Sequence, residues 1–160
     1  MIATQGVAPA ETVGLPAPPP RGQYVVDEAS LLDSASRATV DSITRVRAAI
    51  GLPVYVLTIH SVASHDSSGM TFDELSRRTF KAWSASGPGA EGAAMIVVSE
   101  EDKQARIEVG PRWAQGHDSS LKQIMSDALE PALASGSLDQ GLVLATYETT
   151  WALKPPEVSL

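Results

Sequence analysis

The sequence contains no cysteine, and this absence excludes several kinds of chemistry at once. A chain without thiols forms no disulfide, thiolate metal site or iron–sulfur cluster, and it has no cysteine nucleophile. Asparagine is also absent, so the chain has no N-glycosylation sequon. Its longest apolar runs fall far short of the roughly 20 residues that a membrane helix needs. We therefore expect no membrane span in this chain, and no signal-peptide pattern is visible.

Basic residues are outnumbered, because 12 Lys and Arg stand against 19 Asp and Glu, for a formal net charge of −7. A nucleic-acid-binding protein shows a basic face, and adhesion to anionic lipid uses a polybasic patch. The charge balance argues against both classes and favours basic protein partners. The 160 residues, 43% of them hydrophobic, are typical of one globular domain with a real core.

Proline is concentrated near the start of the chain, where residues 1–22 hold Pro9, Pro16, Pro18, Pro19 and Pro20. Such a run favours an extended polyproline II conformation and does not join a hydrogen-bonded core. We predict a Pro/Ala-rich linker over residues 1–22, a folded domain over 23–154 and a tail over 155–160. An ordered arm is the alternative interpretation of the linker.

Hydrophobic periodicity predicts the elements of the domain. Two nearly continuous apolar runs, Val54–His60 and Ala93–Ser99, indicate buried strands. Residues 104–109 alternate apolar and charged side chains, which predicts an edge strand, and residues 24–26 form a short apolar run. Helices are predicted over 34–50 (capped by Asp33 or Ser34), from the capping box at Thr71, over 119–133 with a break at Pro131, and from a second capping box at Ser137.

The predicted order is strand, helix, strand, helix, strand, strand, helix, helix. This order implies parallel pairing with right-handed crossovers and one antiparallel hairpin. The fold class is therefore α/β, a three-layer α/β/α sandwich with a small, mixed, mostly parallel sheet and an antiparallel edge hairpin. Two helices carry apolar stripes, formed by Val40, Ile43, Val46 and Ile50 and by Leu144, Tyr147 and Trp151. The aromatic side chains expected to pack in the core are Phe72, Phe80, Trp83 and Trp151.

Several carboxylates fall where the sheet presents its loops. Asp27 follows the first apolar run, Glu91 precedes the second buried strand, and Asp127 belongs to the third helix. Because Ca²⁺ and Mg²⁺ bind several oxygen ligands from converging loops, these three residues are candidate metal ligands. The alternatives are that Asp27 caps the turn into the first helix and that dispersed carboxylates are surface charge.

Two neighbouring residues after the edge strand are candidates for binding. Arg112 is a cation in a loop, so it is a candidate anion-binding residue, and the alternative is that it packs beside Trp113. Trp113 is expected to be exposed in that loop and is the best candidate for a partner contact. The sequence has no Gly-x-Ser-x-Gly elbow and no Asp-x-Asp at the end of an apolar strand, so no catalytic residue is identified.

Four short motifs follow one another through the predicted domain. They are Val26-Asp27-Glu28-Ala29-x-Leu31-Leu32, the Gly87–Gly92 loop leading into Ala93–Val98, Arg106-Ile107-Glu108-Val109-Gly110, and Glu130-Pro131 ahead of Gly136–Gly141. This succession, over about residues 24–153, resembles the TPM domain. That domain is shared by a thylakoid-lumen acid phosphatase linked to photosystem II repair and by many bacterial envelope proteins.

The resemblance implies an α/β/α sandwich outside the cytoplasm, in the periplasm, cell envelope or thylakoid lumen. For some members it also implies divalent cations bound in acidic loops and acid phosphatase activity. The loop Gly87–Gly92 departs from the family pattern, since Glu91 stands where members tend to have Asn and no Lys is present. A carboxylate in place of an ammonium is unfavourable for phosphate binding. We expect an accessory, protein-binding module of a membrane-associated, envelope or photosynthetic complex, with Ca²⁺ or Mg²⁺ as candidate cofactor and metal-assisted acid phosphatase as the alternative.

Overall fold

The computed structural model describes residues 14–65, 69–85 and 90–154. Its four strands are β1 (Val25–Asp27), β2 (Val54–Ile59), β3 (Ala94–Ser99) and β4 (Gln104–Val109). Its α-helices are α1 (Ser34–Ala49), α2 (Phe72–Ala85), α3 (Asp118–Ile124), α4 (Glu130–Ser135) and α5 (Leu138–Ala152). Short 3₁₀ turns form η1 (Ala90–Gly92) and η2 (Pro111–Trp113), and a π-helical segment forms η3 (Met125–Leu129).

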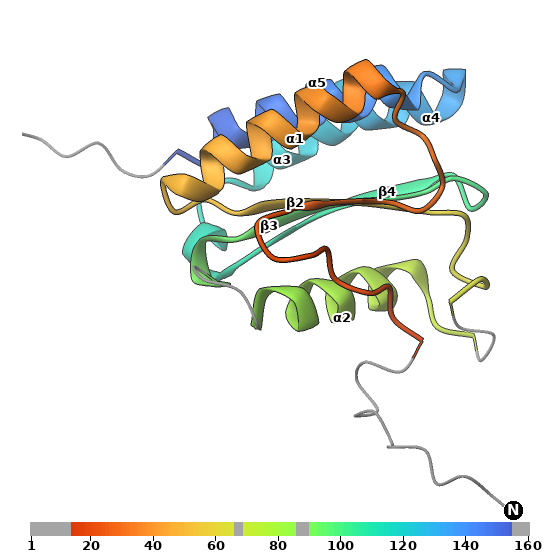
Figure 1. Cartoon of the computed structure of the whole chain (residues 1–160), viewed down its shortest axis with the longest axis horizontal. Coiled ribbons are helices and arrows are strands. Elements are labelled where there is room, and N and C mark those ends of the chain that lie inside the picture. The colour runs from red at the N-terminus through yellow and green to blue at the C-terminus, as the bar shows by residue number, and fades with distance from the viewer. Residues whose placement is uncertain (1–13, 66–68, 86–89, 155–160) are drawn as a thin grey trace, which may run out of the picture.

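The strands form one sheet in the order β1-β2-β3-β4. β1, β2 and β3 pair in parallel, and β4 pairs antiparallel to β3. Helix α2 covers one face of the sheet, and α1, α3, α4 and α5 form a layer on the other (Figure 1). The α/β/α sandwich with an antiparallel edge hairpin is thus confirmed. No helix in the described part of the chain has the length and apolar character needed to cross a bilayer.

Strands β2 and β3 lie in the middle of the sheet because they carry apolar side chains on both of its faces. Every residue of β2 and β3 is buried. Because side chains alternate along a strand, Val56 and Ile96 face the layer of α1 and α5, whereas Leu57 and Val97 face α2. The sheet therefore separates two hydrophobic clusters, one on each face.

Side-chain caps fix where two of the helices begin. Asp33 accepts a hydrogen bond from the backbone N–H of Ser36 at 2.7 Å, and this bond holds the pKa of the Asp33 carboxyl below its ordinary value. Thr71 accepts from the N–H of Glu74 at 3.1 Å, as the first capping box predicts. The second capping box is wrong, because the Ser137 side chain makes no capping hydrogen bond to α5.

The predicted break at Pro131 is also wrong. The chain stays helical through α3, η3 and α4 and ends at Gly136, whose φ is +82°. Proline has no N–H to donate to the preceding turn, and its ring crowds the carbonyl four residues earlier. The π-helical turn Met125–Leu129 lies just before Pro131 and widens the helix there, so the helix accommodates the ring without ending.

Part of the predicted linker packs on the domain. Leu15 lies against the α2-side cluster, and the carbonyl of the buried Pro16 accepts a hydrogen bond from Trp83 Nε1 at 3.0 Å. Residues 14–16 are therefore an ordered arm, which was the alternative interpretation of this segment. Residues 17–22 are also described and form no helix or strand, whereas residues 1–13 of the predicted linker and the predicted tail, residues 155–160, lie outside the described residues.

Candidate functional site

Asp27, at the carboxyl end of β1, uses its carboxylate to hold the chain. Its two oxygens accept hydrogen bonds from the backbone N–H groups of Leu31 and Leu32 at 2.9 and 3.0 Å. The Thr58 hydroxyl also donates to Asp27 and accepts from the N–H of Ala29. This network closes the turn between β1 and α1, which was the alternative to a metal-binding role for Asp27.

Glu91 lies at the other end of the sheet from Asp27. Asp27 pairs with Thr58, which in turn pairs with Val98 near the end of β3. Glu91 belongs to η1, ahead of the first residue of β3, Ala94. The five residues from Ala94 to Val98 alone span about 13 Å of strand. Strands β1 and β3 run in the same direction, Asp27 ends β1 and Glu91 precedes β3. The two carboxylates therefore lie at opposite ends of the sheet.

Asp127 lies in neither loop region. It belongs to η3, in the helical layer, and faces α5. The three predicted metal ligands therefore do not form one site, and we withdraw that prediction. In the part of the chain that the structure describes, no three His, Asp or Glu side chains lie close enough together to hold a metal ion. A hydrolytic mechanism that uses Asp27, Glu91 and Arg112 together has no assembled site.

Arg112 and Trp113 lie beside η1, in a contact that two glycines permit. A Cβ on Gly92 would lie 2.8 Å from Arg112 Nη1, and a Cβ on Gly110 would overlap the carbonyl of Glu91. Trp113 Nε1 donates to the carbonyl of Gly92 at 2.9 Å, and the residue as a whole is 3% exposed. The expected exposure of Trp113 is therefore wrong, and its ring is not available to a partner in this structure.

Arg112 packs beside Trp113, which was the alternative to an anion-binding role. Its guanidinium carbon lies 5.9 Å from the centre of the Trp113 ring, and the residue is exposed. The guanidinium thus covers the buried indole from the solvent side. Anion binding by this residue stays a prediction.

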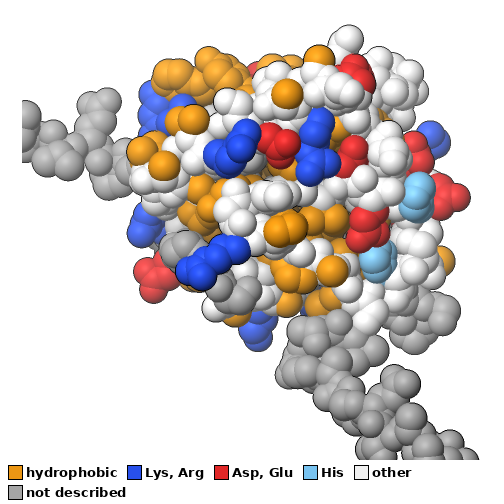
Figure 2. Space-filling view, viewed as in Figure 1, with side chains coloured by type: hydrophobic (Ala, Val, Ile, Leu, Met, Phe, Trp, Pro, Cys, Tyr) orange, Lys and Arg blue, Asp and Glu red, His pale blue; other side chains and the backbone are white. Residues whose placement is uncertain are grey.

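The largest exposed hydrophobic side chains gather on α1 and α5. They are between 42% and 61% exposed, and we call them the α1/α5 strip: Val46, Ile50, Leu144, Tyr147 and Trp151. Helices α1 and α5 pack against each other, so the strip lies along one side of the helical layer. Figure 2 shows hydrophobic side chains next to basic ones at the upper left, where α1 and α5 end in the view of Figure 1.

Cations hold the aromatic end of the strip. Lys154 Nζ lies 4.0 Å from the centre of the Trp151 ring, and the Arg47 guanidinium carbon lies 6.0 Å from it. The Tyr147 and Trp151 rings are 6.1 Å apart at an angle of 60°. These contacts hold the orientation of the Trp151 side chain although the residue is half exposed.

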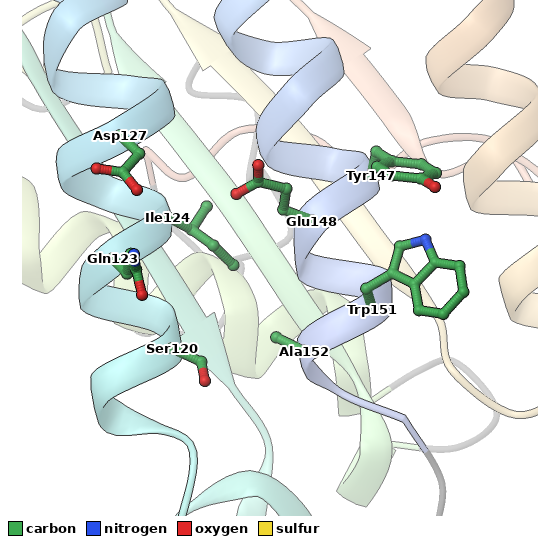
Figure 3. Close-up of a pocket in the computed structure, with 8 residues that line it drawn as sticks. All are labelled: Ser120, Gln123, Ile124, Asp127, Tyr147, Glu148, Trp151 and Ala152. Atoms are coloured by element: carbon green, nitrogen blue, oxygen red, sulfur yellow. The ribbon is translucent and has the colours of Figure 1, made fainter.

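An acidic groove, the α3/α5 groove, adjoins the strip. It has a volume of about 410 Å³ and is lined by Ser120, Gln123, Ile124, Asp127, Tyr147, Glu148, Trp151 and Ala152. The buried Ile124 forms its floor. Asp127 and Glu148 both line the groove, and in Figure 3 the Glu148 carboxyl points from α5 toward the helix that carries Asp127, whereas Tyr147 and Trp151 project from the other side of α5.

A second, apolar groove lies between α1 and α5. Its volume is about 450 Å³, and its lining includes Ile43, Val143, Leu144 and Tyr147. Tyr147 lines both grooves, so it separates the acidic groove from the apolar one. A ligand that covered Tyr147 would meet carboxylates on one side and aliphatic side chains on the other.

The strip includes residues that the sequence assigned to the core. Trp151 was predicted to be buried, but it is 47% exposed, and the stripe of α1 is buried only at Val40 and partly at Ile43. The signal was present in α5, where Leu142, Val143, Leu144 and Ala145 are consecutive. A helix that is apolar around most of its circumference has more than one face to cover.

Comparison with known proteins agrees with the fold. A family model described as the TPM domain matches residues 25–150. The solution NMR structure of the N-terminal domain of a protein from P. gingivalis is 21% identical, has a TM-score of 0.68, and the match covers 81% of this chain and 80% of that one. No curated protein matches the chain.

Two further solution NMR structures are similar. For the N-terminal domain of the cg2496 protein from Corynebacterium glutamicum the identity is 15% and the TM-score 0.58, with 91% of this chain and 93% of that chain covered. For the BA42 protein from Bizionia argentinensis the identity is 19% and the TM-score 0.56, with 76% and 81% covered. At these identities the similarity supports the fold and nothing finer.

Proposed function

The chain belongs to the TPM domain family, and from that membership we propose that it is a protein-binding module of a membrane-associated or envelope complex. Its partner docks on the α1/α5 strip and in the adjoining α3/α5 groove. The partner is a basic, amphipathic segment of another protein. Apolar side chains of that segment cover the strip, and a Lys or Arg enters the groove between Asp127 and Glu148.

The exposure of the α1/α5 strip is the observation that carries this proposal. Isolated exposed hydrophobic side chains are ordinary, whereas a contiguous group on a soluble domain marks an interaction surface. Here Val46 and Ile50 on α1 adjoin Leu144, Tyr147 and Trp151 on α5. Aromatic anchors such as Tyr147 and Trp151 contribute most to affinity when a partner covers them.

The charge of the groove supports a basic partner. Asp127 and Glu148 line it together, and within the described residues neither takes part in an ion pair. A cationic side chain would neutralise both carboxylates. The net charge of −7 also favours the approach of a basic partner over long range.

The proposed location is outside the cytoplasm, in the periplasm, cell envelope or thylakoid lumen. The family resemblance is the support for this part of the proposal. The absence of cysteine is compatible with it, because a chain without thiols is unaffected by an oxidising compartment.

Titration with a designed peptide tests the docking site. The probe is a synthetic amphipathic helix with leucines on one face and lysines beside them, and its matched partner carries glutamate in place of lysine. We expect calorimetry to show that the lysine peptide binds at least about tenfold more tightly than the glutamate peptide. Asp127→Asn with Glu148→Gln should abolish that preference, and Trp151→Ser should weaken binding of the lysine peptide.

The matched control removes the same charge elsewhere. Glu100→Gln with Glu101→Gln changes two exposed carboxylates in the β3–β4 turn, at the carboxyl end of the sheet, and should leave the preference for lysine unchanged. Amide chemical shifts of the wild-type protein should change along α1, α3 and α5. Equal binding of both peptides, or shift changes centred on another surface, would disprove the proposed docking site.

A further inference from the structure

Strand β4 leaves one row of backbone hydrogen-bonding groups without a partner strand. In the described sheet it pairs with β3 on one side only and forms the edge. In an antiparallel ladder, residue pairs whose backbone groups bond each other alternate with pairs whose groups point outward. Gly110 N–H donates to the carbonyl of Ala93 at 2.8 Å, so Gly110 and Ala93 belong to the first kind. Because such pairs alternate along an antiparallel ladder, the N–H and C=O groups of Ala105, Ile107 and Val109 point away from β3.

The edge of β4 is open along these three residues. A groove of about 410 Å³ is lined on the strand side by Ala105, Arg106, Ile107 and Val109 and on the other side by α3 and the first residue of η3. Successive side chains of a strand lie on opposite faces of a sheet, so a groove that touches both Arg106 and Ile107 runs along the edge. The side chains on the helical face are apolar, and those on the α2 face are the ion-paired Arg106 and Glu108.

We propose that two copies of this chain pair through β4, antiparallel, and join their sheets into one sheet of twice the width. The pairing centres on Ile107, which lies opposite Ile107 of the second copy. Ala105 then lies opposite the second copy's Val109. The outward N–H and C=O groups of Ala105, Ile107 and Val109 are thereby all used, and the edge is covered.

The charges of β4 select this register and favour a second copy as the occupant. With Ile107 at the centre, Arg106 lies opposite the second copy's Glu108, and the symmetric pair repeats it. A shift of two residues in one direction would place Arg106 opposite Arg106, and a shift in the other would place Glu108 opposite Glu108. Both shifted registers set like charges against each other, so the sequence of β4 is complementary to itself in one register.

Association of the wild-type protein is measured first. An interface of one strand from each copy is small, so we expect dissociation constants of roughly 10 µM to 1 mM. Sedimentation velocity should show a monomer at low concentration and a dimer at high concentration. Over the same range, hydrogen exchange at the amides of Ala105, Ile107 and Val109 should slow, whereas Arg106 and Glu108 amides should be protected throughout.

Charge reversal then identifies the pairing. Arg106→Glu alone and Glu108→Arg alone each set like charges opposite each other, and we expect each variant to associate at least about tenfold more weakly. An equimolar mixture of the two variants should form a heterodimer, and the variant with both reversals should regain self-association. Arg77→Glu and Glu101→Arg, exposed residues outside β4, are the matched controls.

A backbone variant keeps the test independent of charge. Ala105→Pro removes an N–H that points away from β3, so the fold should persist while association is lost. Three results would each overturn the proposal: a wild-type protein that stays monomeric at about 1 mM, association that survives both charge reversals, or no added protection at Ala105, Ile107 and Val109. Self-association lost in Trp151→Ser but kept in the β4 variants would assign the contact to the α1/α5 strip instead.

Discussion

At the scale of single residues, Asp27 shows how a candidate metal ligand can have a structural role instead. Its carboxylate oxygens accept from two backbone N–H groups and from the Thr58 hydroxyl. These bonds replace water around the carboxylate and fix the path of the chain from β1 toward α1. A metal at Asp27 would have to compete with three donors that belong to the fold.

Removing the Asp27 carboxylate should lower stability. We expect Asp27→Ala to lower the free energy of unfolding by about 1–3 kcal/mol, because two backbone donors and the Thr58 hydroxyl lose their acceptor. Asp27→Asn should fall between this variant and wild type, since one of its two side-chain oxygens remains. Urea denaturation measures the difference.

An exposed aspartate serves as the control for that measurement. Asp118 lies in the first turn of α3, so Asp118→Ala should cost less than about 1 kcal/mol. A loss at Asp27→Ala no larger than at Asp118→Ala would contradict the structural role of the Asp27 carboxylate.

Asp102 repeats this arrangement in the loop after β3. Its carboxylate accepts from the Ser99 hydroxyl at 2.6 Å and from the Val62 N–H at 2.8 Å, and these bonds hold the pKa of Asp102 below its ordinary value. Carboxylates that follow strands β1 and β3 thus both bind local donors. In this protein, the carboxylates placed just after these strands are explained by the hydrogen bonds with which they close the loops.

At the scale of elements, α4 and α5 come into close contact at Gly141. A Cβ on Gly141 would overlap the Cβ of Ala132 and lie 2.9 Å from the carbonyl of Ala128. The missing side chain therefore lets α5 approach the helix that precedes it. That approach sets how α5 lies across the layer, and with it the position of Tyr147 and Glu148.

A side chain at Gly141 should destabilise the domain although alanine favours helices. We expect Gly141→Ala to lower the free energy of unfolding by about 1–3 kcal/mol, since the overlap outweighs the roughly 1 kcal/mol gained in helix propensity. Thermal unfolding followed by circular dichroism measures the effect. Adding Ala132→Gly should restore part of the loss, and a Gly141→Ala variant as stable as wild type would disprove the close contact.

The sequence predicted the elements well where one physical signal dominated. Continuous apolar residues identified β2 and β3, and alternation located β4 at residues 104–109 as the structure has it. Local patterns were less informative where a neighbouring element decides the outcome. The π-helical turn before Pro131 and the unused cap at Ser137 depend on how α4 and α5 pack, which no local pattern encodes.

The candidate site could be predicted less well, for two reasons. The opposite placement of Asp27 and Glu91 follows from strand direction, so the predicted element order already contained it. The exposure of Trp151 did not follow from α5 alone, because most of this helix is apolar and only its neighbours determine which face is covered. Sequence rules fail most often where a surface serves binding instead of folding, and the α1/α5 strip is the docking surface that we propose.

At the scale of the whole molecule, the residues that form the hydrophobic core differ from those that form the α1/α5 strip. The core consists of one cluster on each face of the sheet. The strip residues Val46 and Ile50 lie outside both clusters and are more than half exposed. Folding therefore does not depend on burying them.

Polar substitution in the strip should leave folding intact. We expect Val46→Ser with Ile50→Ser to change the free energy of unfolding by less than about 1 kcal/mol, because neither side chain is buried. Leu142→Ala, in the core of the same layer, should cost about 2–5 kcal/mol. Chemical denaturation compares them, and a strip variant as unstable as Leu142→Ala would show that these side chains support the fold.

The three tryptophans occupy three different environments. Trp83 is buried on the α2 side of the sheet, Trp113 is buried on the helical side, and Trp151 is half exposed on α5. Trp83 thus samples the α2 side of the sandwich, whereas Trp113 and Trp151 sample the interior and the surface of the other side. Replacing two of them with phenylalanine at a time would give three single-fluorophore proteins. Their emission and quenching would resolve whether the two sides of the sandwich melt together and report a bound partner without any added label.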